Sequence, residues 1–479
     1  MAFTEFYAQT TGDNLNAGST TSDAAAFTYA GGTFVRATGV FTVASGNPSS
    51  DGVAVGDFAS IYTTAGATVA TFVGRVTARD ATTITVSLSA IAGATSTVSE
   101  TAAAATCKVG GAWKGPNGTV AFPFAFATST MTNSSGDVPR VNFKSGTYSP
   151  TSAMTHNLAG PVVFEGYYST VGDNSLNGST WTPPVIDGSS SSFIVLTFGS
   201  SATNIEIANM EFKSTRSAGS AFAILEIDAS FLLARRCVVH DCRRVGMYVT
   251  GAGSRVLECE AYLCAASNTS GDGAFYMQGT GSSIVRSIAH DNTRVGIQGT
   301  SYITVEGCIC DTNADGGFAT TSGALIKNCD FYNNTNAGIN LANSSGALVT
   351  ISNCNFLKNS TWGINGSGSG ARVGGVQSCR FGTGTQANTS GTTTGLKGMQ
   401  ELGSANYATD VAPWTDPANG DFRINLAAAK NAGVGRFLQT QASYSGTIGY
   451  PDVGAAQHND SGGGGASPIG LGSPVIRGR

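Results

Sequence analysis

Apolar and polar residues alternate in short runs that recur through the middle of the chain every 21 to 28 residues. In each repeat one residue, here called the anchor, has an apolar residue three positions before it and another two positions after it. A repeat of this length indicates a solenoid, in which each coil buries its apolar face only against its neighbours. The successive anchors are Met210, Cys237, Cys259, Ser287, Cys308, Cys329, Cys354 and Cys379.

A second column keeps the same phase. The position five residues after the anchor is held in later coils by Asn292, Asn313, Asn334 and Asn359, and in two earlier coils by Cys242 and Cys264. In a parallel β-helix, equivalent residues of neighbouring coils stack about 4.8 Å apart. We therefore expect the asparagines to form an inward ladder whose amides bond one another and the buried backbone.

A third column is made of glycine. It stands nine positions after the anchor in several coils, among them Gly246, Gly296, Gly317 and Gly338. We expect these glycines to supply the positive φ angle that a tight corner requires. Three columns in phase predict an all-β fold built as a single-stranded parallel β-helix.

The first hundred residues follow a different pattern. Val53 to Ser89 contains short alternating runs separated by glycine-rich turns, which predicts a small antiparallel β domain. We divide the chain into an attachment or oligomerisation domain at 1–105, a parallel β-helix at 106–400, a C-terminal cap of the helix at 401–458 and a flexible tail at 459–479. Four consecutive glycines make the tail a tether, which either frays or docks on a neighbouring subunit.

Composition excludes several classes of protein. Hydrophobic residues make up 41% of the chain and charged residues only 12%, so it lacks the signature of disorder. A net charge of −4 gives no phosphate-binding footprint, and we expect no nucleic-acid partner. The first residues lack a basic start and an apolar core, and no apolar run reaches membrane-spanning length. We therefore expect cytoplasmic synthesis and no membrane insertion.

The ten cysteines raise the question of disulfide bonds. Most of them share one column, where like Cβ atoms lie about 4.8 Å apart, whereas a relaxed disulfide needs about 3.8 Å. We therefore expect free thiols that pack as small buried hydrophobic groups.

Several segments resemble a known superfamily. The pattern "SGTY" at 145–148, "VVFEGY" at 162–167, "VIDG" at 185–188 and the repeated "NCxFxNNxxxGI" are similar to the right-handed parallel β-helix superfamily of pectate lyases and phage tailspikes. The resemblance covers about 107–458, and "TGDNLNAG" at 11–18 is similar to the opening of many such chains. It implies a right-handed helix, but this fold hosts many functions.

A phrase of histidine, aspartate and arginine occurs twice, two coils apart. It comprises His240, Asp241 and Arg244 in one coil and His290, Asp291 and Arg294 in the other. Like atoms two coils apart should lie about 9–10 Å from each other, and the carboxylates of an inverting glycosidase lie about 6.5–9.5 Å apart. Asp241 and Asp291, with Asp311 one coil further, are therefore candidate acid–base residues. The alternative is that histidine and aspartate cap the turn and arginine neutralises the aspartate on a solvated edge.

The coil from Cys259 to Ser287 is longer than its neighbours, and its surplus at 265–272 predicts an outward loop. Loops on a rigid scaffold are frequent binding sites, although an insertion without a role is the alternative. The candidate glycan-binding residues are His240, Arg244, Tyr262, Asn268, Asp272, Tyr276, His290 and Arg294.

Metal and cofactor sites are not indicated. The four histidines do not cluster in the sequence, and the cysteine spacing follows the coil rather than a zinc pattern. Pectate lyases of the superfamily use calcium-binding acidic residues and a catalytic arginine, and we find no acidic cluster of that kind. We expect no metal and no cofactor.

Low charge, synthesis without an export signal, the N-terminal β domain and the tether-like tail favour a virion protein of a tailed bacteriophage. We expect a tailspike, fibre or surface-decoration subunit on the virion surface, outside the cell, that presents its helix to host-surface polysaccharide. Contacts with other virion proteins would run through 1–105 or the tail, and the tailspike resemblance implies a homotrimer. The alternatives are a polysaccharide-degrading hydrolase or lyase and a bacterial surface adhesin.

Overall fold

The structure is a computed structural model that forms two compact units. One unit comprises Met1–Asn174 with Trp181–Phe212, and the other comprises Lys213–Arg479 with Ser175–Thr180. The structure describes residues 3–11, 21–22, 24–35, 37–65, 68–87, 101–112, 138–150, 153–157, 159–171, 173, 182–189, 195–214, 223–264, 273–341, 348–366, 372–377, 379–381, 387–390, 401–402, 405–406, 414–416 and 421–424.

The first unit contains early strands of the helix. Its strand β1 (Phe3–Ala8) pairs in parallel with β8 (Val138–Lys144), so β1 belongs to the helix rather than to the small domain that follows it. Arg140 holds the pair together, because its Nε lies 3.0 Å and its Nη2 2.5 Å from the carboxylate of Glu5. The other strands are β9 (Gly146–Tyr148), β10 (Met154–His156), β11 (Ala159–Tyr167), β12 (Pro184–Asp187), β13 (Leu196–Phe198), β14 (Thr203–Ala208) and β15 (Glu211–Lys213).

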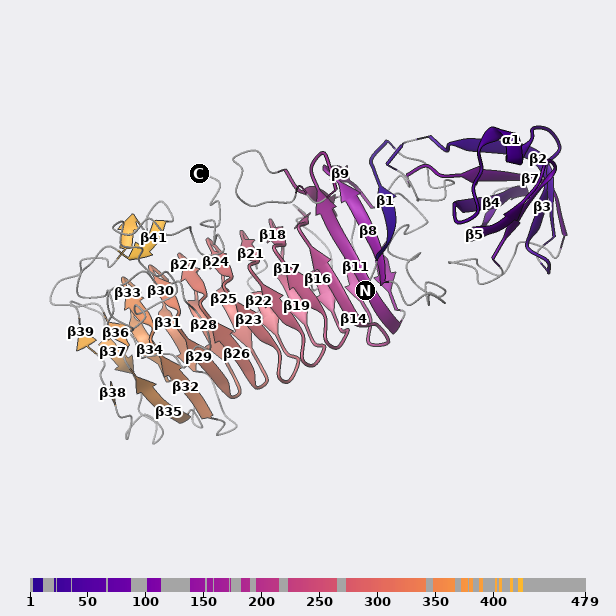
Figure 1. The fold of residues 1–479 in the computed structure, drawn as a ribbon. Helices are drawn as coiled ribbons and strands as arrows, with labels where there is room; N and C mark the ends of the chain where they lie inside the picture. Colours follow the sequence, from indigo (N-terminus) through magenta and orange to yellow (C-terminus); the bar gives the residue numbers. More distant parts are fainter. Residues whose placement is uncertain are drawn as a thin grey trace, which may run out of the picture. The chain divides into compact units, whose positions relative to one another are not determined.

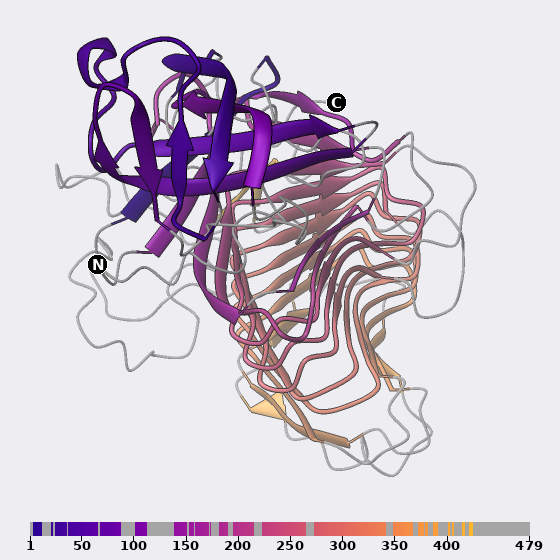
Figure 2. The ribbon, with the colours of Figure 1, turned by 90° about the vertical axis from the view of Figure 1, so that its right-hand side faces the viewer.

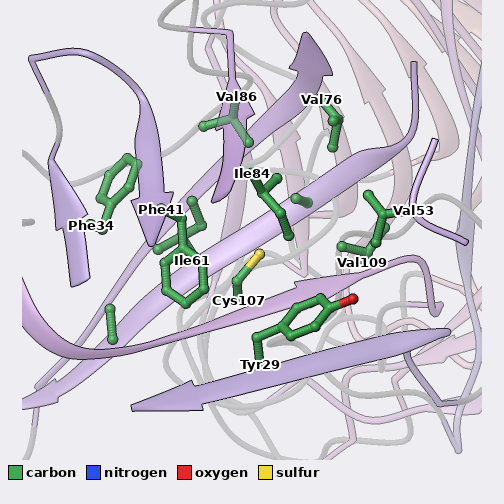
Figure 3. Packing of buried hydrophobic residues seen from close by; sticks show 12 residues of the cluster. Tyr29, Phe34, Phe41, Val53, Ile61, Val76, Ile84, Val86, Cys107 and Val109 are labelled. Atoms are coloured by element: carbon green, nitrogen blue, oxygen red, sulfur yellow. The ribbon is translucent and has the colours of Figure 1, made fainter. Parts of the chain in front are cut away.

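A closed antiparallel barrel lies between β1 and β8 in the sequence. Its strands run in the order β2-β3-β6-β5-β4-β7. Alternate residues point inward and make an apolar core that includes Phe34, Phe41, Ile84 and Cys107 (Figure 3). The elements are β2 (Phe27–Val35), β3 (Val40–Thr42), α1 (Pro48–Asp51), β4 (Phe58–Ala65), β5 (Thr68–Arg79), β6 (Thr83–Val86) and β7 (Thr101–Val109). The alternating pattern thus correctly predicted a small N-terminal antiparallel β structure.

The second unit is a stack of coils whose equivalent strands lie side by side in parallel (Figures 1 and 2). Sheet 1 contains β17 (Leu233–Arg235), β20 (Arg255–Leu257), β23 (Ser283–Val285), β26 (Ile303–Glu306), β29 (Ala324–Lys327), β32 (Leu348–Ser352), β35 (Arg372–Gln377) and β38 (Glu401–Leu402). Sheet 2 contains β18 (Val238–His240), β21 (Glu260–Tyr262), β24 (Ile288–His290), β27 (Ile309–Asp311), β30 (Asp330–Tyr332), β33 (Asn355–Leu357), β36 (Arg380–Phe381) and β39 (Ala405–Asn406).

Sheet 3 completes each coil. It contains β16 (Ala223–Ile227), β19 (Val245–Val249), β22 (Gly273–Met277), β25 (Val295–Gly299), β28 (Gly316–Thr320), β31 (Ala337–Leu341), β34 (Trp362–Asn365) and β37 (Ala387–Ser390). The strands β40 (Trp414–Asp416) and β41 (Asp421–Ile424) form a separate antiparallel pair. We call the corner from sheet 1 to sheet 2 the first bend, and the corner from sheet 2 to sheet 3 the second bend.

The anchor side chains satisfy the backbone at the first bend. All ten cysteines are buried and free. The thiols of the first five anchor cysteines, Cys237 to Cys354, point toward the carbonyl two residues earlier, as in Cys329, whose Sγ lies 3.2 Å from the oxygen of Lys327. The hydroxyl of Ser287 replaces a thiol in this column. It accepts a hydrogen bond from the N–H of Cys259 at 3.1 Å and donates one to the carbonyl of Val285 at 3.0 Å.

Amides play the equivalent part at the second bend. Asn334 Oδ1 accepts the Nδ2 of Asn313 at 3.0 Å, and Asn334 Nδ2 donates to Asn359 Oδ1 at 2.9 Å and to the carbonyl of Cys310 at 3.0 Å. Asn292 and Asn313 repeat the pattern one coil earlier, with 2.8 Å between Nδ2 and Oδ1. These side chains are buried, so the ladder bonds groups that water cannot reach.

Positive φ angles at the bends belong to residues other than the glycine column. Among the described residues, those that precede an anchor or a ladder amide turn the chain, as Arg236 (φ 54°) and Asp291 (φ 51°) do. The expectation that Gly246, Gly296, Gly317 and Gly338 supply positive φ was therefore wrong. These glycines are needed for space instead: a Cβ on Gly317 would lie 2.5 Å from the Phe331 ring.

Candidate functional site

Three aromatic rings stack on the outer face of sheet 2. His240 ends β18, Tyr262 ends β21 and His290 ends β24, and the three residues are in register. The ring centroids of His240 and Tyr262 are 4.7 Å apart with planes at 6°, and those of Tyr262 and His290 are 5.2 Å apart with planes at 18°. We call these residues the ring column. The two imidazoles are largely buried, with side-chain exposures of 9% for His240 and 13% for His290, whereas the flanking Asp241 and Asp291 are 36% and 28% exposed.

Three carboxylates fix the two imidazoles. Asp241 Oδ2 lies 2.7 Å from His240 Nδ1, and Asp291 Oδ2 lies 3.0 Å from His290 Nδ1. Glu260, which the sequence did not suggest, places Oε1 2.9 Å from His290 Nε2. Each histidine is thus held at its Nδ1 by the aspartate that follows it, and His290 is held on both ring nitrogens.

The two carboxylates around His290 set its charge. Burial alone would lower the pKa of His290, but the hydrogen bonds that its ring nitrogens donate to Asp291 and Glu260, with the charges of both carboxylates, raise this pKa to about 9. His290 is therefore an imidazolium at neutral pH, stacked on Tyr262 and enclosed by two anions.

The candidate acid–base residues follow the same edge of sheet 2. Asp241 and Asp291 lie in the second bend, two coils apart, and each bonds its own histidine. Asp311 ends β27 in register with His290 and accepts the hydroxyl of Thr312 at 2.7 Å. The structure thus arranges the three aspartates along one edge of sheet 2, and Glu260, at the start of β21, reaches His290 from the other end of the strand.

A second aromatic pair lies on sheet 3. Tyr276 is in register with Tyr248, and their ring centroids are 5.2 Å apart with planes at 37°. Tyr248 donates its hydroxyl to Gln278. The sequence suggested Tyr276 but missed Tyr248, because the surplus at 265–272 gives the two tyrosines different offsets from their anchors.

The remaining predicted residues fall into two groups. Arg244 lies half-buried in the second bend, and Arg294 Nη1 lies 2.5 Å from Oδ2 of Asp315 in the next coil. Asn268 and Asp272, with the predicted loop at 265–272, lie outside the described residues.

Charged residues also gather at the first bend, which the sequence did not suggest. Glu258 Oε2 lies 3.0 Å from Arg236 Nε, and its Oε1 lies 2.7 Å from Arg286 Nη2. The three residues occupy equivalent positions in three successive coils, each one residue before the anchor. Aligning the residues that directly precede the anchors would have revealed this alternation of positive and negative charge.

Within the described ranges, no group of three or more His, Cys, Asp and Glu side chains gathers as metal ligands do. In that same part of the chain, none of the helices has the length and apolar character needed to cross a bilayer.

Residues 222–377 match the family of the right handed beta helix region. Together with the three parallel sheets, this match over about a third of the chain shows that the protein contains a right-handed parallel β-helix. The columns of anchors and asparagines predicted this fold, and the resemblance of the sequence motifs predicted its hand.

Three solved structures have a similar fold. Geobacillus virus E2 ORF18 is 14% identical, with a TM-score of 0.42 over 57% of this chain and 54% of that chain. The A-module of the Azotobacter vinelandii mannuronan C-5 epimerase AlgE4 is 12% identical, with a TM-score of 0.34 over 56% and 88%. The tailspike gp49 of Acinetobacter baumannii bacteriophage Fri1, a capsular polysaccharide depolymerase, is 11% identical, with a TM-score of 0.33 over 67% and 63%. The chain thus spans about half the length of the first of these, and no curated protein sequence matches it.

Proposed function

We propose that this protein binds a surface glycan through the ring column and its carboxylates. Sugar hydroxyls both donate and accept hydrogen bonds, so a site for them needs fixed acceptors beside fixed donors. Asp241, Glu260 and Asp291 supply charged acceptors whose orientation is set by the imidazoles they bond. Because charge-assisted hydrogen bonds are stronger than neutral ones, a few such groups suffice to orient a ligand. The observation that carries this proposal is the ring column with its three bound carboxylates.

The three rings of the ring column and Glu260 lie on strands of sheet 2, and Asp241 and Asp291 directly follow strands. A site built on strands is held more precisely than one on loops. The ring column repeats at the spacing of the coils, so it offers equivalent polar edges along the helix axis. A chain of sugars can therefore contact several coils at once, which favours a polymer over a single sugar.

We further propose that the protein is a structural virion subunit of a tailed bacteriophage, a tailspike, fibre or surface-decoration protein. Low overall charge, the barrel and the glycine-rich tail support this assignment. In that role the barrel and the tail contact other virion proteins, the helix meets host polysaccharide, and three chains associate. Mass spectrometry of purified particles tests the location, and light scattering of the purified protein tests the trimer.

Glycan binding is tested on an array of bacterial capsular and O-antigen polysaccharides. Tyr262→Ala removes the central ring of the ring column, so we expect at least tenfold weaker binding. Tyr302→Ala is the matched control, because Tyr302 is a tyrosine with 60% exposure outside the ring column, and it should bind as the unmodified protein does. Equal binding by Tyr262→Ala, or no glycan bound by the unmodified protein, would contradict the proposal.

A polysaccharide-degrading activity is the second candidate. It is favoured by the three aspartates at one edge of sheet 2, Asp241, Asp291 and Asp311, the last of which ends its strand in register with His290. Release of reducing ends from a bound polysaccharide, abolished by Asp291→Asn, would establish it. Binding without release assigns the same edge to recognition alone.

A further inference from the structure

The charge of the helix is unevenly distributed along the chain. Residues 233–296 contain seven arginines, no lysine and five acidic residues, although the whole chain has a net charge of −4. Residues 297–381, which continue the helix, contain four basic and four acidic residues. The coils that carry the ring column are therefore basic in an otherwise acidic protein, and their basic residues are all arginine.

Part of this positive charge is not neutralised within the first bend. Glu258 is one carboxylate shared between two guanidinium groups, those of Arg236 and Arg286. The side chain of Arg286 is 46% exposed, and that of Glu258 only 17%. The group therefore presents a surplus positive charge to the outside, on the side of Arg286.

Arg255 adds to this surplus. It is exposed at the start of β20, and its register neighbours in sheet 1 are Leu233 and Ser283, neither of which is acidic. It precedes Glu258 by three residues, so it lies beside the same bend. We call Arg255 and Arg286 the arginine margin.

Arg286 of the arginine margin lies close to the ring column. Arg286 and His290 are separated by four residues, which span about 13 Å at most even when fully extended. An oligosaccharide can cover that distance and contact both groups. The carboxylates nearest the rings, Glu260 and Asp291, already enclose the imidazolium of His290. Their negative charge is thus partly compensated before a ligand arrives.

We propose that the glycan bound at the ring column is an acidic polysaccharide, whose carboxylates pair with the arginine margin while its hydroxyls meet the ring column. This inference rests on the proposed glycan binding. Guanidinium suits this task, since its planar fork bonds both oxygens of a carboxylate and it stays charged at any ordinary pH. Repeated acidic groups along a polymer would meet guanidinium groups in successive coils.

The experiment compares each polysaccharide with a neutral form of itself. Bacterial capsular polysaccharides are printed in native form and after chemical reduction of their carboxyl groups to alcohols, and binding is measured at 20 mM and 200 mM NaCl. We expect binding to native acidic polysaccharides, at least tenfold weaker binding to the reduced forms, and a marked fall at the higher salt concentration, where screening shortens the reach of charge.

A double variant assigns the effect to the arginine margin. Arg255→Gln with Arg286→Gln should weaken binding at 20 mM NaCl at least tenfold and flatten the salt dependence. The fold is retained, because Glu258 keeps its contact with Arg236. Lys327→Gln with Lys358→Gln removes the same amount of charge from later coils and should bind as the unmodified protein does.

The outcomes separate the two proposals. Equal binding to native and reduced polysaccharides overturns the acidic ligand and leaves glycan binding intact. Equal weakening by the arginine and lysine variants also overturns it, because the effect then follows net charge rather than the arginine margin. No binding to any polysaccharide overturns both proposals.

Discussion

Early and late coils of sheet 2 place their aromatic stacks on opposite faces of the same sheet. In β18, β21 and β24 the inward residues are Val239, Ala261 and Ala289, and the stacked rings lie outside. In β30, β33 and β36 the rings are inside: Phe331, Phe356 and Phe381 stack with centroids 5.1 and 4.9 Å apart and planes within 8°.

The two stacks share a geometry because the coil spacing of about 4.8 Å imposes it on any column of equivalent rings. They differ in what they contribute. The inner stack fills the core, where each ring removes a large apolar area from water. The outer stack lies on the other face of the sheet, where carboxylates fix its two imidazoles and its central ring, Tyr262, is only partly buried.

Removing one ring from each stack tests whether the two stacks contribute differently to stability. Phe356→Ala should lower the free energy of unfolding by about 3–5 kcal/mol, because it opens a cavity between two stacked rings. Tyr262→Ala should cost less, about 1–2 kcal/mol, since Tyr262 is only partly buried and its removal loses two ring contacts without opening a closed core cavity. Urea unfolding followed by circular dichroism measures both. Equal losses would mean that the outer stack is also a core element.

The amide ladder extends from Asn292, in the last coil of the outer stack, to Asn359 and should contribute more to stability than the outer rings. Asn334→Ala leaves buried groups without a hydrogen-bond partner, including Nδ2 of Asn313 and the carbonyl of Cys310. We expect a loss of about 3 kcal/mol, because buried polar groups without partners are costly. Asn334→Cys should lose less, since Cys242 and Cys264 hold that position in earlier coils. Urea midpoints of the two variants test the order, which would be reversed if only side-chain volume mattered.

The outer stack should make stability depend on pH. The pKa of His290 is raised to about 9 in the folded protein, whereas an unfolded histidine has a pKa of about 6.5. The stabilisation is therefore complete below pH 6.5 and is lost as pH rises through 9, a change of about 2–3 kcal/mol. Urea unfolding at pH 6 and pH 9.5 measures it. His290→Gln should show a smaller difference between the two pH values, and an unchanged difference would assign the effect to other groups.

The smallest effect concerns the bend that separates the two histidines of the outer stack. Leu263 is 49% exposed and has a φ of 51°, a conformation that costs a leucine more than a glycine. Leu263→Gly should raise the free energy of unfolding by about 0.5–1 kcal/mol. Leu257→Gly, in the extended strand β20, should lower it. Melting temperatures of the two variants should move in opposite directions.

The columns of the helix could be predicted because stacking forces equivalent residues into the same slot. Cys308 and Asn313 each keep their offset through several coils, so the pattern survives in one sequence. The reason for the glycine column could not be predicted, because the need for space at Gly317 comes from Phe331, which is fourteen residues away in the sequence.

Part of the candidate site was also predictable, and part was not. The repeated histidine–aspartate phrase identified His240 and His290 as a related pair. The stacking of both histidines on Tyr262 was not predicted, because the residues around Tyr262 do not resemble the histidine–aspartate phrase. The contact of Glu260 with His290 was not predicted either, because it joins two neighbouring coils and no local sequence pattern indicates it.

The pairing of β1 with β8 has a consequence for how this chain is made. More than a hundred residues separate the two strands, so during synthesis β1 emerges long before the strand that completes it. The barrel is made entirely within that interval and can fold from its own antiparallel contacts. The strands β1 and β8 must then pair after the barrel has folded, and such pairing of residues far apart in the sequence is slow. A short glycine–serine linker in place of the barrel should let the helix begin sooner.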